Sequence, residues 1–324
     1  MKKKLTFGGA INQAIDLAMG QNDRVFCIGE DIALMGGSFG VTRGLLQKYG
    51  EDRVIDTPIS EALIVGAAVG AAAVGMVPIA EIMFADFMTY CFDQLVNQAA
   101  KMRYMYGGNI ELPMVVRFPG GGGIQAAAQH SQNLENLLVH IPGLKVVYPT
   151  TVEDARGLML SAINDKNPVM FFEHKYLYAT MEEVTEEFEP IPFGKAAIRK
   201  EGSDVTIVAT GYCVNKALTA AEKLAGEGIK AEVIDPRTLF PLDTATIYQS
   251  VDKTGKLVVV TEENKRSAWS AEMAALVAED KYDSLKAKIV RIGALNTPTP
   301  FAKNLEDYVL PQEEDIINGV KEIC

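Results

Sequence analysis

Residues 54–87, VIDTPISEALIVGAAVGAAAVGMVPIAEIMFADF, decide the fold that the rest of the chain extends. They begin with a short β-branched run, continue after Glu61 as a helical segment of Gly, Ala and aliphatic residues, and end in a second apolar run at residues 77–82. A strand, a helix and a second strand of these lengths are typical of parallel sheets that helices cover on both faces. The stretch therefore predicts an α/β fold.

The same stretch also raises the question of a membrane span, because residues 62–80 carry no charge. However, the segment is rich in Gly and Ala, which bury too little area to drive insertion. Pro78 interrupts it, and Glu61 and Glu81 flank it where cationic anchors are usual. We expect a buried helix that leads into a buried strand, and no membrane association.

The pattern of strands alternating with helices continues along the chain. Further strands are predicted at residues 25–28, 114–118, 144–148, 169–172, 205–209, 231–234, 257–260 and 288–292. Further helices are predicted at residues 87–104, 214–224, 245–251, 268–278 and 313–322, and one more from Thr150, with Glu153 completing a capping box. The alternation lapses only in an acidic, proline-containing stretch. We therefore expect an α/β domain at residues 1–175, a linker at 176–202 and a smaller α/β domain at 203–324.

Composition excludes several classes of protein. Thirty-one Lys and Arg against 42 Asp and Glu give a net charge of −11, and the longest basic run is Lys2-Lys3-Lys4, so nucleic-acid binding is not expected. A hydrophobic content of 48% excludes disorder. Four scattered cysteines, with no zinc-ligand spacing and no secretory signal pattern, favour a reducing, cytoplasmic location.

Two titratable residues are the best candidates for chemistry. Glu61 opens an almost wholly apolar helix, where burial desolvates the carboxyl while the helix N-terminus stabilises its charge, a balance that suits proton exchange. A purely capping carboxylate is the alternative. Of the three histidines, His130 follows a glycine run and precedes a helix, which favours a cleft position. His140 and His174 are expected to be packed or surface residues.

The two glycine clusters do not by themselves identify a ligand site. Residues 36–40, GGSFG, lack the spacing of a dinucleotide or phosphate loop and are expected to form a mobile surface loop. The four glycines at residues 120–123 follow a predicted strand, so they suit either close approach to a ligand or a hinge. No G-x-S-x-G motif supports a serine hydrolase.

Taken in order, several motifs resemble one known family over essentially the whole chain. They are Gly29-Glu30-Asp31, residues 56–61 (DTPISE), residues 81–87 (EIMFADF), Gln129-His130-Ser131, residues 142–147 (PGLKVV), residues 161–169 (SAINDKNPV) and residues 297–301 (TPTPF). The chain resembles the beta subunit of the thiamine-diphosphate-dependent 2-oxo acid dehydrogenases, the decarboxylating first component. Within that family, its motifs are most similar to those of acetoin dehydrogenase or bacterial pyruvate dehydrogenase.

The resemblance implies a fold and a set of site residues. It implies a pyrimidine-binding parallel-sheet domain followed by a transketolase C-terminal-like domain. Glu61 matches the glutamate that hydrogen-bonds N1′ of the thiamine diphosphate aminopyrimidine. Phe87 matches the ring that stacks on that aminopyrimidine, Met83 matches another wall of the pocket, and His130 matches the histidine thought to assist acyl transfer to the lipoyl group.

The resemblance also implies ions and partners. A structural potassium ion would be held by main-chain carbonyls at Met114, Ala162, Ile163, Asp165 and Asn167. The Gly-Asp-Gly motif that holds magnesium and the diphosphate does not occur in these 324 residues. We therefore expect an alpha subunit to hold the magnesium within an alpha2-beta2 heterotetramer. The expected product acceptor is a lipoyl-bearing acyltransferase.

Three other functions stay open at this point. A transketolase-like C-terminal subunit would need arginines for a sugar phosphate, and only Arg103 and Arg117 are candidates. A non-catalytic assembly partner could retain the same fold. A nucleotide-binding dehydrogenase is disfavoured, because no fingerprint loop follows a predicted strand.

Overall fold

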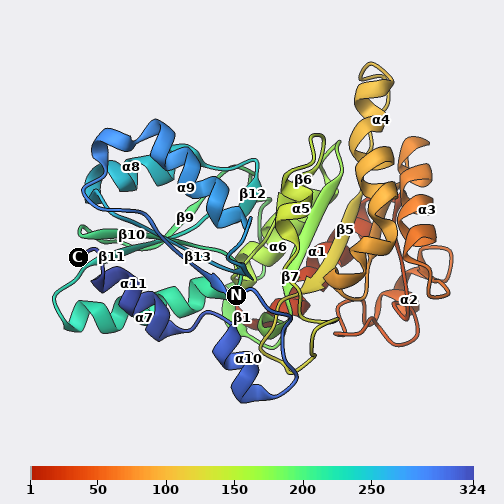
Figure 1. Ribbon diagram of the computed structural model, residues 1–324. Helices are drawn as coiled ribbons and strands as arrows, with labels where there is room; N and C mark the ends of the chain where they lie inside the picture. Colours follow the sequence, from red (N-terminus) through yellow and green to blue (C-terminus); the bar gives the residue numbers. More distant parts are fainter. Residues whose placement is uncertain (1) are drawn as a thin grey trace. The chain divides into compact units, whose positions relative to one another are not determined.

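The computed structural model describes residues 2–324, which separate into two compact units (Figure 1). Unit 1 runs to Gly120 and resumes over Leu137–Phe193, whereas unit 2 comprises Gly121–Asn136 and Gly194–Cys324. The later crossing from one unit to the other falls inside the predicted linker at residues 176–202. Residues 121–136, by contrast, pack with unit 2 although they lie within the stretch expected to form the first domain.

A parallel sheet forms the centre of unit 1. Its strands pair in the order β6-β7-β5-β4-β2-β3, and all of these pairs are parallel. The strands are β2 (Val25–Gly29), β3 (Val54–Asp56), β4 (Val77–Glu81), β5 (Val115–Gly120), β6 (Lys145–Val147) and β7 (Val169–His174). Strands β2, β4, β5 and β7 are buried throughout, as expected where helices cover both faces. A separate antiparallel ribbon joins β1 (Lys2–Thr6) to β8 (Met181–Thr185).

Helices pack on this sheet in two groups. Helix α1 (Phe7–Gln21) contacts α6 (Val152–Ile163), and α3 (Glu61–Ala73) contacts β4 and the short helices that follow it. The shorter helices of this part of the chain are α2 (Leu45–Tyr49), α5 (Glu135–Val139) and the 3₁₀ helix η3 (Lys175–Leu177). The cap of α6 is Thr151, which accepts the Asp154 N–H at 3.1 Å, so the expected cap at Thr150 is wrong by one residue.

The apolar stretch at residues 62–82 folds as expected. Helix α3 begins at Glu61 and ends at Ala73, and β4 follows from Val77. Within residues 2–324 the structure has no helix long and apolar enough to cross a membrane.

The single helix predicted at residues 87–104 is instead a chain of three different helices. A 3₁₀ helix, η1 (Ala85–Cys91), leads into a π-helix, η2 (Gln94–Ala99), and then into α4 (Ala100–Met105). The sequence pattern does not reveal the change, because the four-residue spacing of apolar side chains from Phe87 to Ala99 is close to the period of an ordinary α-helix. Departures from α geometry of this kind are frequent at functional sites.

Unit 2 is built on a second, smaller sheet in the order β14-β13-β10-β11-β9, with only β9 antiparallel to its neighbour. The strands of this sheet are β9 (Ala197–Lys200), β10 (Val205–Ala209), β11 (Ala231–Asp235), β13 (Leu257–Asn264) and β14 (Val290–Ala294). The short strand β12 (Thr238–Phe240) also lies in unit 2 but is not part of this sheet. Its helices are α7 (Cys213–Gly226), α8 (Thr244–Thr254), α9 (Trp269–Asp280), η4 (Tyr282–Ser284), α10 (Lys303–Val309) and α11 (Glu313–Lys321).

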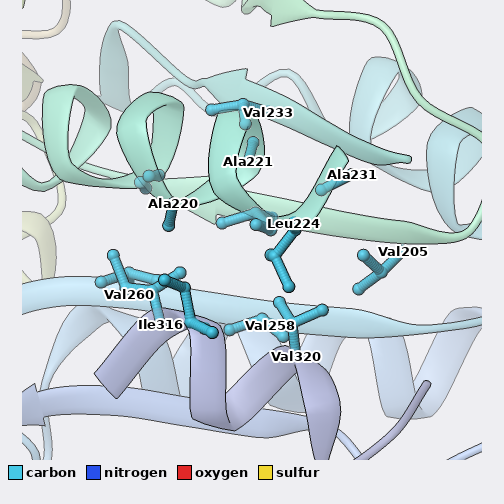
Figure 2. Close-up of a cluster of buried hydrophobic side chains, with 14 of the residues drawn as sticks. Val205, Ala220, Ala221, Leu224, Ala231, Val233, Val258, Val260, Ile316 and Val320 are labelled. Carbon is cyan, nitrogen blue, oxygen red and sulfur yellow. The ribbon is translucent and has the colours of Figure 1, made fainter. Parts of the chain in front are cut away.

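The core of unit 2 lies between this sheet and helices α7 and α11. Figure 2 shows Leu224 of α7 and Val320 of α11 close to Val258 of β13, and all three side chains are fully buried. The α/β fold with a parallel-sheet domain followed by a smaller α/β domain is thereby confirmed.

Candidate functional site

The carboxyl edge of the unit 1 sheet is the place where a ligand site is expected. From β2 the chain continues to β3 on one side, whereas from the neighbouring β4 it continues to β5 on the other. Open α/β sheets bind ligands at such a reversal of strand order. Glu30 follows β2 directly, Glu61 follows the turn after β3, and Met83 and Phe87 follow β4.

Glu61 is the first residue of α3 and is 8% exposed. The N–H groups of the first helical turn lack partners within the helix and carry partial positive charge, which stabilises a carboxylate at this position. Helix α3 also packs against η1, and the charge of Glu61 acts on Cys91 of that helix. The structure thus brings Glu61 to the element that carries Phe87.

Glu30 is a second buried carboxyl beside Glu61. Burial raises the pKa of Glu30 above its usual value, and the nearby charge of Glu61 raises it further. Two interacting carboxyls favour a state in which one of them keeps its proton. Within the described residues, the Glu30 Oε1 atom is buried and has no hydrogen-bond partner. An atom of this kind is a natural contact for a polar group of a ligand.

The turn that carries Glu30 is fixed from two directions. Asp56, the last residue of β3, accepts the Ala33 N–H at 2.7 Å, and the Thr42 hydroxyl donates to the Ile32 carbonyl at 2.6 Å. Asp31 adopts a left-handed φ of 55°, which is uncommon for a residue other than glycine. These contacts set the position of Glu30 relative to β3 and its turn.

The glycine loop at residues 36–40, expected to be a mobile surface loop, is hydrogen-bonded into the same region. The Gly37 N–H donates to the Asp31 carbonyl at 2.9 Å. Gly37 has a φ of 79°, and a Cβ there would lie 2.9 Å from Glu81 Oε1. The loop is therefore packed against the end of β4, where only glycine fits.

An aromatic cluster borders the site. Phe84 meets the rings of Phe39 and Phe87 edge to face, each at 5.9 Å between ring centroids. Phe87 lies on η1 and is half-buried, and the exposed Tyr90 is tilted against it at 6.4 Å. Met83, between β4 and η1, is also half-buried. Phe87 and Met83 therefore present apolar surface that the core does not fully cover.

A buried ion network lies behind the edge of the sheet. Arg117 of β5 is 1% exposed and donates to both oxygens of Glu173 at 2.7 Å. It also forms an ion pair with Glu81, and the Tyr178 hydroxyl donates to Glu173 at 2.6 Å. Arg103 donates to Asn167 Oδ1 at 2.7 Å. Both arginines considered for a phosphate are thus engaged by protein groups.

His130 lies in unit 2, within residues 121–136. The residue is half-buried, and its backbone N–H donates to the Ala127 carbonyl at 3.4 Å. Gln125 and Ala127 just before it have φ values of 59° and 60°. His140 is exposed, and His174 is fully buried with its Nδ1 accepting the Tyr176 N–H, so both fit the structural roles expected of them.

The residues expected to hold potassium gather around one turn of unit 1. Ala162 and Ile163 end α6, and the Asp165 N–H donates to the Ala162 carbonyl at 3.3 Å. The Met114 carbonyl accepts the Val169 N–H at 2.9 Å, which places it beside the start of β7. Among residues 2–324 no group of three or more His, Cys, Asp or Glu side chains could hold a metal ion. A cation here would depend on carbonyl oxygens.

Two functional features were missed by the sequence analysis. Glu30 could have been predicted as a site residue, because it is a carboxylate directly after a buried strand. The sequence analysis names it only within the motif Gly29-Glu30-Asp31. The attachment of residues 121–136 to unit 2 depends on Glu262 and Glu306, more than 120 residues away along the chain. No local pattern reveals such a contact.

Comparison with known proteins defines the class of the two units. Residues 3–181 match the pyrimidine binding domain of transketolase, and residues 194–316 match the transketolase C-terminal domain. A solved structure titled "Split gene transketolase, inactive beta4 tetramer" superposes with a TM-score of 0.81 at 24% identity and covers 98% of each chain. That similarity concerns the fold.

Sequence relatives define the family within this class. The chain is 48% identical to the acetoin:2,6-dichlorophenolindophenol oxidoreductase subunit beta of Bacillus subtilis, over 100% of this chain and 98% of that one. It is 47% identical to the pyruvate dehydrogenase E1 component subunit beta of Rickettsia felis, over 99% and 98%. The chain belongs to the family of beta subunits of thiamine-diphosphate-dependent 2-oxo acid dehydrogenases, which confirms the expected resemblance.

Proposed function

We propose that this chain supplies the aminopyrimidine side of a thiamine diphosphate site. It acts with an alpha subunit on acetoin or a 2-oxo acid and passes the acyl group to a lipoyl domain. The observation that carries the proposal is Glu61, buried at the start of α3 and coupled to Glu30 at the reversal point of a parallel sheet. Thiamine diphosphate, when bound, supplies stabilisation of negative charge at a carbonyl carbon.

The residues present fit an aminopyrimidine. Such a ring needs a carboxyl partner for a ring nitrogen and an apolar surface for its face. Glu61 supplies the carboxyl, and it would hold or release a proton at its Oε atoms. The raised pKa of Glu30, caused first by burial and then by Glu61, favours a proton within this pair. The unpartnered Oε1 atom of Glu30 offers a further polar contact for the same ring.

Phe87 and Met83 would supply the apolar surface for the ring. Both are half-buried on the segment that follows β4, and η1 holds Phe87 on the side of α3. Phe84 packs edge to face on Phe87 and so limits the rotation of its ring. Stacking against a fixed ring orients a flat ligand and excludes water from one of its faces.

His130 is the proposed group for the acyl transfer step. A half-buried imidazole leaves part of its ring accessible to a ligand, and it can exchange a proton with that ligand, as transfer to a lipoyl sulfur requires. Cytoplasmic location agrees with this role and with the free cysteines Cys27, Cys91, Cys213 and Cys324.

The diphosphate half of the site is proposed to come from the alpha subunit. No Gly-Asp-Gly motif occurs in the sequence, so magnesium would be held by the partner in an alpha2-beta2 assembly. A structural potassium ion is proposed at the carbonyls of the turn between α6 and β7, together with Met114. Its support is that Ala162 and Ile163 end α6 just before this turn, while the Met114 carbonyl accepts the Val169 N–H just after it.

A sugar-phosphate substrate is disfavoured for this site. Arg117 is buried between Glu81 and Glu173, and Arg103 is bonded to Asn167. Neither guanidinium is left to bind a phosphate group. The transketolase-like alternative therefore lacks the charged groups that it would need from this chain.

The test is Glu61→Gln in the enzyme reconstituted with its alpha subunit. Glutamine keeps the size of the side chain but cannot exchange a proton, so turnover with an artificial electron acceptor should fall by about 100-fold or more. Assembly with the alpha subunit should persist, as checked by size-exclusion chromatography. The matched control is Glu51→Gln, an exposed glutamate, which should leave turnover unchanged.

The same assay separates the competing functions. Full turnover by Glu61→Gln would contradict the proposal, and no turnover by the unmodified pair with any 2-oxo acid or acetoin would favour a non-catalytic partner. Acetoin and pyruvate should be assayed side by side, because the relatives that act on them are almost equally similar to this chain.

A further inference from the structure

Three buried carboxylates of unit 2 hold the segment of residues 121–136. Glu262 and Glu263 lie near the end of β13, and Glu306 lies on α10; they are 6%, 7% and 0% exposed. None of them belongs to the site proposed above. Each accepts a backbone N–H of the segment, and Glu262 also accepts the side-chain N–H of Asn133 at 3.2 Å.

The contacts are concentrated on the glycine run. Glu262 Oε1 accepts the Gly122 N–H at 2.6 Å, and the two oxygens of Glu306 accept the N–H groups of Gly123 at 2.8 Å and Gln125 at 3.0 Å. Hydrogen bonds to an ionised acceptor are stronger than those between neutral groups. One carboxylate that accepts two nearby N–H groups also fixes their relative orientation.

The backbone of this segment needs such support. Gly121 and Gly123 have φ values of 84° and 89°, and Gln125 and Ala127 share the left-handed region although they have side chains. A non-glycine residue persists in that region only where its surroundings impose it. Carboxylate contacts hold this segment before His130, at Gly122, Gly123 and Gln125, and after it, at Asn133 and Asn136.

Packing does not enclose the whole segment, because part of it borders open space. A cavity of about 290 Å³ in unit 2 is lined by Ser131 and Asn133 of the segment together with Glu262. Within the described residues the Ser131 hydroxyl is buried and unpartnered. With open space on this side, the hydrogen bonds to Glu262 and Glu306 carry more of the constraint.

We propose that Glu306, together with Glu262, is a positioning residue that fixes the path of residues 121–128 and thereby places His130 for acyl transfer. The inference rests on the proposed function of His130. Neither glutamate touches the reacting groups in this scheme. Each acts only through the segment that carries the histidine.

The test is Glu306→Gln in the enzyme reconstituted with its alpha subunit. The glutamine carbonyl can accept one of the two N–H groups, but its NH₂ group faces the other. We expect amide hydrogen exchange in peptides that cover residues 122–128 to rise about tenfold or more. Acyl transfer to a free lipoyl domain should fall about tenfold, while reduction of an artificial acceptor stays within about twofold.

The matched control is Asp243→Asn. Asp243 is also a buried carboxylate of unit 2 that accepts backbone N–H groups, those of Ala196 at 3.0 Å and Thr246 at 3.2 Å. Within the described residues its hydrogen bonds go to Ala196 and Thr246, and none goes to residues 121–136. This variant should leave both the exchange of residues 122–128 and the acyl transfer rate unchanged, which separates positioning from general loss of stability.

The outcomes are distinguishable. Unchanged exchange in Glu306→Gln, or faster exchange with an unchanged transfer rate, would overturn the positioning role. If Glu306→Gln does not fold, Glu262→Gln and the exchange of the Gly122 amide decide the question in the same way. A fully active His130→Gln would overturn the role of the histidine, whereas the exchange measurement would still report whether the carboxylates hold the segment.

Discussion

Arg117 shows how one buried side chain can organise the edge of a sheet. Its guanidinium joins Glu81 of β4 and Glu173 of β7, the neighbours of its own strand on either side. Burial raises the pKa of Glu81 above its usual value, although Arg117 opposes the shift. Because Glu81 also contacts the loop at Gly37, the network connects the sheet interior to the site.

At this scale we predict that Arg117→Met destabilises the chain by about 3–5 kcal/mol, because two carboxylates would lose their partner in a buried position. Denaturant unfolding of the purified chain measures the loss. Lys166→Met, which breaks the exposed pair between Lys166 and Glu111, is the control and should have little effect. Equal stability of Arg117→Met and the unmodified chain would show that the network contributes no net stability.

At the scale of elements, sequence periodicity predicted the helices and strands whose positions depend on the burial of nearby apolar residues. Strand β4, which is buried throughout, and helix α3, which begins at Glu61, lie where their apolar patterns indicate. The change from 3₁₀ to π to α geometry between Ala85 and Met105 was not predictable, because the four-residue apolar spacing of this stretch suits a continuous α-helix. Partners such as Glu306 and Gly123, 183 residues apart, leave no local signal either.

Glu263 connects two elements of unit 2 and makes its stability depend on pH. It accepts the Trp269 N–H at the start of α9 at 2.8 Å and the Asn136 N–H at 3.3 Å. Burial raises the pKa of Glu263 from 4.5 to about 7, although both N–H groups oppose the shift. Between pH 4.5 and about pH 7, Glu263 keeps a proton in the folded chain that it has released in the unfolded chain. Stability therefore falls as pH rises from about 4.5 to about 7 and is constant above that range.

We predict that Glu263→Gln removes this contribution, which is at most about 3 kcal/mol. The thermal unfolding midpoint of the variant should exceed that of the unmodified chain at pH 8, and the difference should shrink towards pH 5. Glu279→Gln, at an exposed position on α9, should keep the original pH dependence. Parallel curves for Glu263→Gln and the unmodified chain would contradict the assignment.

At the scale of the whole molecule, the two family domains account for the chain but supply only part of the proposed site. In the proposed site, Glu61, Phe87 and Met83 would provide contacts for the aminopyrimidine. The site residues were predicted from family motifs and stay predictions, whereas the family and the fold class are confirmed.

We predict that the purified chain alone binds thiamine diphosphate weakly, even with magnesium, because the diphosphate and its metal would lack a binding motif. Isothermal titration calorimetry should give a dissociation constant at least about 100-fold higher than that of the reconstituted pair, a loss of about 2.7 kcal/mol. Tight, magnesium-dependent binding by the isolated chain would refute the shared-site proposal.

Residues 121–136 pack with unit 2 although both of their chain neighbours belong to unit 1, and this bears on how such proteins can evolve. Recombination at the linker would exchange the C-terminal part of the chain but leave this segment behind with the N-terminal part. The hybrid would then combine one ancestor's glycine run with another ancestor's glutamates at positions 262, 263 and 306. Unless those acidic positions agree, its buried amide groups would lose their acceptors. The two halves of the gene are therefore constrained to be inherited together.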